Sequence, residues 1–327
     1  MFIPRIHEVS MAFKLHLLAF LVLLISCSDD PEPPGSLQFS DDPHDISIVT
    51  SDIDLFWSIH DQAAGNYQES DFLERYFSAG TESLSQFFET KIQTASQLTQ
   101  KLSDENYHAY YLSIRENSEN IDKASIQFAM NQLEASYPAS VFSDVILVIG
   151  ALGTGGTVVK NGNMVIGVEF FTKSPDTSTD QLNPWMATVT RSPDYLPSIV
   201  LHELIHVQQR NHAIKENLKA EDTLLELSLA EGIADFVTNL ILGIYFNDHL
   251  PDYADPLEKD LWLEFKSEMH GTDTENWLFN AATSENRPGD LGYYVGYKIA
   301  EHYYFNQPDQ SLALRDLLEI RNAEEFL

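Results

Sequence analysis

Residues 200–207 read VLHELIHV, an H-E-x-x-H motif set among apolar residues that are typical of a buried helix. Pro197 suits the first turn of that helix, where a missing backbone N–H breaks no hydrogen bond. His202 and His206 are four residues apart, about 400° around a helix, so both imidazoles project from one face and can bind one metal ion. Glu203 lies beside the open side of such an ion, where its carboxylate can take a proton from metal-bound water without binding the ion.

Two histidines are too few for a catalytic zinc site, which needs a third protein ligand and an open position for water. The first candidate is Glu231, on a second predicted helix that begins with a capping box formed by Thr223 and Glu226. An unpaired carboxylate among the apolar residues of this helix would be costly, and a metal ion removes that cost. Asp235 lies one turn further on the same face, placed to accept the second ring proton of a metal-binding histidine.

His212 is the alternative third ligand. It stands where the metzincins have a third histidine, but that family has Gly at the position of Gln209, where the chain leaves the helix. Gln209 is a good helix former, and if the helix continues, His212 faces away from His206. We therefore expect His212 to lie on the surface.

The spacing of the two motifs resembles a known family. His202-Glu203-x-x-His206 is followed, 25 residues after His206, by Glu231-Gly232-x-x-Asp235. This pattern is similar to that of the gluzincin zinc metallopeptidases and, more closely, to a family of predicted zinc-dependent proteases found in bacterial lipoproteins. The resemblance implies one catalytic Zn²⁺ held by His202, His206 and Glu231, with Glu203 as general base and a peptide or protein as substrate.

The remaining pattern predicts an α+β fold that is mainly helical. Apolar residues recur at helical spacing from about residue 52 to 137 and again after residue 197. Between them, residues 145–149, 157–159 and 164–171 are strand-like, and the turn signal at 161–163 separates the last two. This pattern predicts a small sheet with an edge hairpin packed on the H-E-x-x-H helix. In gluzincins an edge strand binds the substrate backbone; residues 164–171 are the candidate for it, although an interior position is equally open.

Aromatic residues line a further predicted helix between about residues 289 and 305. Tyr294, Tyr297 or His302 could donate a hydrogen bond to the oxyanion of a tetrahedral intermediate. An aromatic stripe at helical spacing is also typical of a core, and we favour that interpretation.

The charge of the chain argues against nucleic acid as a partner. It has 50 acidic and 19 basic residues, a formal net charge of −31, and 43% apolar residues. Such a chain can bury a sizeable core but would repel phosphates. Its single cysteine excludes an intramolecular disulfide.

The amino-terminal pattern predicts export and lipid anchoring. Residues 15–25 form an apolar run, broken only by His16, that is too short for a membrane span and close to the core of a signal peptide. The run ends in Leu-Ile-Ser-Cys, which resembles a bacterial lipobox, so Cys27 is expected to carry lipid and anchor the protein to the outer membrane, in the periplasm or on the cell surface. The expected organisation is a signal peptide over 1–26, an acidic Pro-rich tether over 27–50 and one metallopeptidase-like domain over 51–327.

The sequence leaves two other functions open. The protein could be a surface binding lipoprotein that keeps a structural or vestigial metal site, or it could hydrolyse another bond, such as an amide in cell-wall material. Metal content alone does not separate these from a peptidase, whereas peptide hydrolysis that depends on Glu203 does.

Overall fold

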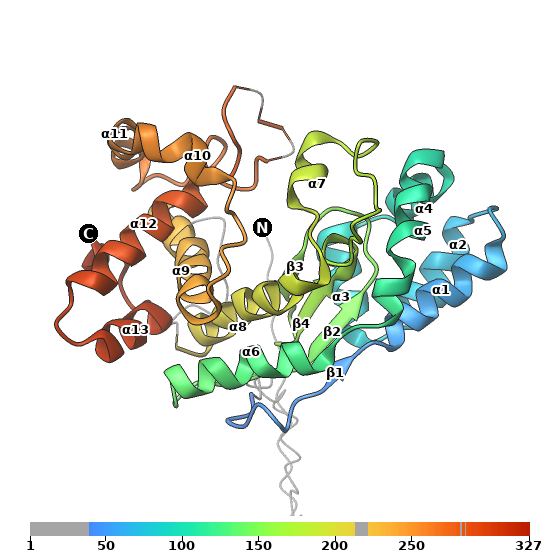
Figure 1. Ribbon diagram of the computed structural model, residues 1–327, viewed down its shortest axis with the longest axis horizontal. Coiled ribbons are helices and arrows are strands. Elements are labelled where there is room, and N and C mark those ends of the chain that lie inside the picture. Colours follow the sequence, from blue (N-terminus) through green and yellow to red (C-terminus); the bar gives the residue numbers. More distant parts are fainter. Residues whose placement is uncertain (1–38, 213–221, 282, 285) are drawn as a thin grey trace, which may run out of the picture. The chain divides into compact units, whose positions relative to one another are not determined.

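A mixed sheet of four strands, in the order β1-β2-β4-β3, lies at the centre of the computed structural model (Figure 1). The structure describes residues 39–212, 222–281, 283–284 and 286–327. The strands are β1 (Ile48–Val49), β2 (Val145–Val148), β3 (Gly156–Val158) and β4 (Met164–Gly167). β1 and β4 run parallel to β2, while β3 and β4 form an antiparallel hairpin. The predicted edge hairpin is therefore confirmed.

The edge strand of this hairpin is β3, so the edge position considered for residues 164–171 is wrong. β4 pairs with β2 on one side and with β3 on the other, which places it inside the sheet. The parallel β2–β4 pairing is a long-range contact that no local pattern specifies. β1 also pairs with β2, so the packed chain begins before residue 51, where the sequence suggested the domain would start.

Helices make up most of the fold, which confirms the mainly helical α+β class. Of the helices in the described residues, six precede β2: α1 (Ser51–Ala63), α2 (Glu69–Phe72), α3 (Glu82–Phe87), α4 (Ala95–Ser103), α5 (Glu105–Glu119) and α6 (Lys123–Ser136). Those after the sheet are α7 (Pro184–Val189), α8 (Leu196–His212), α9 (Leu224–Leu242), α10 (Leu250–Ala254), α11 (Glu258–Glu268), α12 (Leu291–Asn306) and α13 (Gln310–Glu319). Short π-helical turns follow α2 and α3, at Leu73–Phe77 and Phe88–Ile92. Short 3₁₀ turns occupy Val168–Phe170, Pro193–Tyr195, Asp255–Leu257 and Ala323–Phe326.

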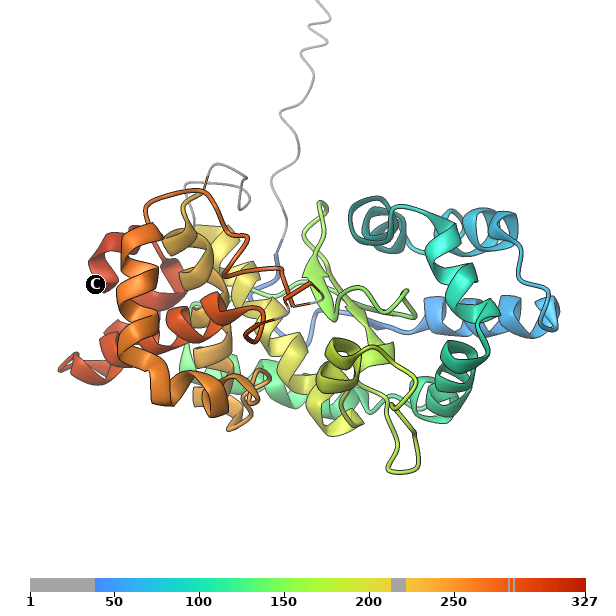
Figure 2. The same cartoon turned by 90° about the horizontal axis from the view of Figure 1, so that it is seen from above.

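α8 occupies the middle of this arrangement. It contacts β3 on one side and α9 on the other, and Figure 2 shows α1–α5 beyond the sheet and α9–α13 beyond α8. Leu201, Leu204 and Ile205 of α8 are completely buried. The helix that carries the motif is thus a core element, as its apolar flanks predicted.

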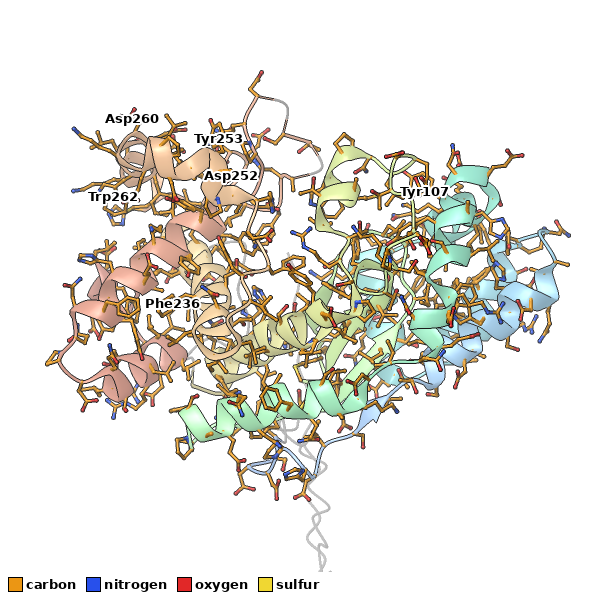
Figure 3. The ribbon with its side chains drawn as sticks, viewed as in Figure 1. Tyr107, Phe236, Asp252, Tyr253, Asp260 and Trp262 are labelled. Carbon is orange, nitrogen blue, oxygen red and sulfur yellow. The ribbon has the colours of Figure 1, made fainter. Side chains whose placement is uncertain are left out.

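α9 and α12 cross with their backbones in contact. A Cβ atom added to Gly232 would lie 2.1 Å from the carbonyl carbon of Gly296, and one added to Gly296 would lie 1.8 Å from the carbonyl oxygen of Ser228. Near this crossing lies Phe236 of α9, labelled in Figure 3. Its ring packs edge-on against that of Tyr297 of α12, with ring centroids 5.5 Å apart. Gly232 follows Glu231 directly, so the close crossing helps to set the position of that carboxylate.

Replacing Gly296 with Ala should therefore reduce the free energy of unfolding by about 3 kcal/mol or more, because backbone cannot move aside as a flexible side chain can. Denaturant unfolding measures the effect. Gly153→Ala is the matched control, since a Cβ at Gly153 meets nothing within 4 Å. Equal stability of the two variants would contradict the close crossing.

Among the residues described, no helix is long and apolar enough to span a membrane. The predicted signal peptide and Cys27 lie outside the described residues. Lipid anchoring stays a prediction of the sequence.

Candidate metal centre

His202, Glu203 and His206 all project from α8, and Glu231 reaches them from α9. The capping box that starts α9 forms as predicted: the Thr223 hydroxyl accepts from the Glu226 backbone N–H, and the Glu226 carboxylate accepts from that of Thr223. His202 and Glu231 are buried, and His206 is nearly so. The two helices thus bring Glu231 close to His202 and His206, although Glu231 follows His202 by 29 residues in the chain.

The donor atoms of His202, His206 and Glu231 converge. Oε2 of Glu231 lies 3.4 Å from Nε2 of His202 and 3.3 Å from Nε2 of His206, and one donor atom of each residue lies within 4.8 Å of the others. Ligands of a tetrahedral zinc ion, at about 2.0–2.1 Å from the metal, are about 3.3 Å apart. The donor types and their spacing therefore fit Zn²⁺.

Both imidazoles are held by partners on their other ring nitrogen. Nδ1 of His202 lies 2.9 Å from Oδ1 of Asp235, and the Asn247 amide donates to the other oxygen of that carboxylate at 2.7 Å. Nδ1 of His206 lies 2.8 Å from Oε1 of Gln209, whose amide donates to the Ala230 carbonyl. Acceptors at both Nδ1 atoms favour the tautomer that leaves Nε2 free to bind a metal.

The partner of His206 was not foreseen. In the sequence Gln209 is recognisable only as a helix former, although its position three residues after His206 places it on the same face. α8 indeed continues through Gln209, and His212 is its last described residue. The side chain of His212 lies outside the described residues.

Glu203 lies between the donor group and the edge strand. A Cβ atom on Gly156 of β3 would lie 2.8 Å from Oε1 of Glu203, so glycine is what allows this close approach. Burial raises the pKa of Glu203, the two imidazoles oppose that shift, and the charge of Glu231 adds to it. A carboxylate with a raised pKa beside a metal group suits a general base.

Glu231 titrates in the opposite direction. Burial alone would raise its pKa, but the imidazoles of His206 and His202 hold it well below its ordinary value. Glu231 is therefore ionised, as an oxygen ligand for a divalent ion must be.

Tyr294, Tyr297 and His302 of α12, the residues considered as oxyanion donors, do not line this site. The Tyr294 hydroxyl donates to Asp255 at 2.7 Å, that of Tyr297 accepts from Asn239 at 2.7 Å, and His302 is exposed. Their neighbour Tyr293 does come to it: its ring lies 6.4 Å from that of His202, and it lines the same cleft. Successive side chains on a helix are turned by about 100°, so Tyr293 and Tyr294 lie on different faces of α12 and only Tyr293 lines the cleft.

A cleft of about 1440 Å³ contains the donor group. Its walls include β3 and the residues before it, together with a set of apolar side chains from α7, α8 and the segment after α9: Trp185, Met186, Val189, Ile199 and Phe246. The cleft is thus open to a ligand along the edge strand.

Comparison with known proteins agrees with this geometry. A family model described as "Predicted Zn-dependent protease" (DUF2268) matches residues 160–325, just over half of the chain. The matched part contains the H-E-x-x-H helix, Glu231 and Tyr293. No curated protein and no solved structure was found to match the chain. The chain belongs to this family of predicted Zn-dependent proteases.

Proposed function

We propose that the protein is a metallopeptidase of the gluzincin type, in which His202, His206 and Glu231 hold one catalytic zinc ion and Glu203 is the general base. The observation that carries this proposal is the convergence of the donor atoms of His202, His206 and Glu231 beside the buried carboxylate of Glu203, which is not one of the three donors. When bound, zinc would polarise the scissile carbonyl and lower the pKa of water. Glu203 would take a proton from the attacking water and return it to the leaving amine.

The substrate backbone would bind along β3. Backbone bonds at Gly155 and Val159 join β3 to β4. Hydrogen bonding alternates along an antiparallel pair, so Gly156 and Val158 direct their backbone groups to the open edge. The Val158 carbonyl already accepts from Arg210 at 2.8 Å. The N–H groups of Gly156 and Val158 are then available to a substrate strand lying beside Glu203.

The apolar wall of the cleft favours an apolar side chain in the substrate. Trp185, Met186 and Phe246 line it, and burial of a large apolar side chain there contributes about 1.5–3 kcal/mol. Digestion of a peptide library, analysed by mass spectrometry, tests both the activity and this preference. Activity should disappear on chelation and return with Zn²⁺ but not with Mg²⁺, which prefers oxygen ligands. A well-folded, zinc-loaded protein that cleaves no peptide would instead favour the non-catalytic binding role.

Tyr293 would stabilise the oxyanion. Burial and the nearby charge of Glu231 raise its pKa well above the ordinary value, so its hydroxyl stays protonated and can donate. Tyr293→Phe should lower kcat by about 10²–10³, the effect of losing one oxyanion donor, while zinc stays bound. Tyr294→Phe is the matched control and should retain full kcat, because that hydroxyl donates to Asp255. Equal kcat losses in both variants would contradict the assignment.

A further inference from the structure

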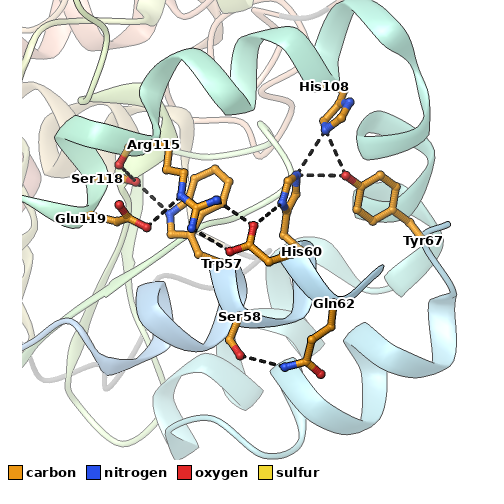
Figure 4. Close-up of polar contacts among 10 residues, drawn as sticks. Trp57, Ser58, His60, Gln62, Tyr67, His108, Arg115, Ser118 and Glu119 are labelled. Carbon is orange, nitrogen blue, oxygen red and sulfur yellow. Dashed lines mark hydrogen bonds and ion pairs between the residues drawn. The ribbon is translucent and has the colours of Figure 1, made fainter. Parts of the chain in front are cut away.

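A cluster of two histidines and a tyrosine, side chains of types that can bind metals, lies in the amino-terminal helices, outside the part matched by the family model. His60 is in the last turn of α1, Tyr67 is in the segment before α2, and His108 is on α5 (Figure 4). Nε2 of His60 lies 3.2 Å from Nε2 of His108, and the Tyr67 hydroxyl lies 2.9 Å and 3.0 Å from the two nitrogens. Three donor atoms from three segments of the chain thus face one point.

The spacing of these atoms is that of metal ligands. The contacts of 2.9–3.2 Å are slightly shorter than the 3.3 Å and 3.4 Å contacts around Glu231. They are close to the separation of about 3.3 Å expected for ligands of a tetrahedral zinc ion. A small ion bound to all three would require only a slight outward movement.

The surroundings of His60 are those of a metal-binding histidine. Its Nδ1 lies 3.4 Å from Oδ1 of Asp61, and Arg115 donates to both oxygens of that carboxylate, at 2.7 Å and 2.9 Å. The Arg115 guanidinium lies over the Trp57 ring, 4.8 Å from its centroid. A carboxylate held in this way sets the tautomer of the imidazole and directs the lone pair of Nε2 towards His108 and Tyr67.

Hydrogen bonds do not account for all three close contacts at once. If His60 carries its proton on Nδ1, the Tyr67 hydroxyl and Nε2 of His108 hold at most two protons for the three contacts. One of the three close contacts is then left without a proton between its two atoms, next to the buried ring of His60. A cation placed among the three atoms interacts with all their lone pairs.

We propose that His60, Tyr67 and His108 bind a second metal ion, a first-row divalent ion such as Zn²⁺, which ties α1 and the segment before α2 to α5. Imidazole ligands suit zinc, copper and nickel. Tyr67 and His108 are only partly buried, so an ion can reach them from solvent. The net charge of −31 would concentrate cations near the protein.

Zinc stoichiometry tests the proposal in a background where the first site is disabled. The full chain carrying His202→Ala and His206→Ala should bind one zinc ion after dialysis against buffered free zinc, measured by plasma mass spectrometry. Adding His108→Asn should lower the ratio to zero, whereas adding His270→Asn, an exposed histidine, should leave it at one. A ratio of zero in the background, or of one with His108→Asn, would overturn the proposal.

Two milder variants separate metal binding from simple packing. Tyr67→Phe keeps the ring and removes only the oxygen, and we expect zinc affinity to fall at least tenfold. Asp61→Asn should weaken zinc by about 10–100-fold, as for other outer-shell partners. Zinc should also raise the thermal midpoint of the background protein and not that of its His108→Asn variant. If the group is only a hydrogen-bond network, neither the background protein nor any of these variants will bind zinc or change its thermal midpoint when zinc is added.

Discussion

Glu203→Gln is expected to lower peptide hydrolysis by about a thousandfold or more while zinc stays bound. The substitution keeps the shape of the side chain beside Gly156 but removes its ability to accept a proton, and general base catalysis contributes about 10²–10⁴ to the rate. The zinc ligands assigned here do not include Glu203, so metal content should not change. Turnover of a peptide found in the library digest, measured with zinc content on the same sample, checks both parts.

A carboxylate elsewhere in the cleft provides the control for this experiment. Glu324 also lines the cleft but is more than half exposed and pairs with His270, so Glu324→Gln should keep near-normal turnover. If Glu203→Gln itself turned over substrate at a near-normal rate, the general-base role would be wrong.

Loss of Glu231 is expected to remove zinc from the first site. Glu231→Ala deletes the oxygen that lies within 3.4 Å of both imidazoles. The loss of zinc affinity should exceed the roughly 10–100-fold loss expected for Asp235→Ala. His212→Ala should leave zinc affinity nearly unchanged, since α8 runs unbroken through Gln209.

Chelator competition in a His108→Asn background measures these affinities at the first site alone. The order of effects matters more than their size: Glu231→Ala should be the weakest binder, followed by Asp235→Ala. Zinc that is lost in His212→Ala and kept in Glu231→Ala would favour a metzincin-like site.

The parts of the site that depend on local spacing could be predicted from the sequence. His202 and His206 share a face because they are four residues apart on one helix, and Asp235 follows Glu231 by one turn for the same reason. The capping box at Thr223 is likewise a local signal. The structure also explains the glycine at position 232, because the backbone of α12 leaves no room for a side chain there.

What could not be predicted depends on contacts between distant segments. The order of the strands makes β3 the edge and buries β4, and nothing in either strand alone specifies that order. The choice of Tyr293 over Tyr294 depends on the rotation of α12 about its axis, which its close crossing with α9 sets. The meeting of His60, Tyr67 and His108 requires the packing of α1 on α5, so the spacing of these residues gave no signal.

An anomalous difference map from zinc-soaked crystals, recorded at the zinc absorption edge, tests the central claim most directly. We predict a peak about 2.1 Å from Nε2 of His202, Nε2 of His206 and a carboxylate oxygen of Glu231, with Glu203 beside the ion but not bound to it. A map with no peak among these three side chains, or with a peak at which another residue replaces Glu231, would contradict the account.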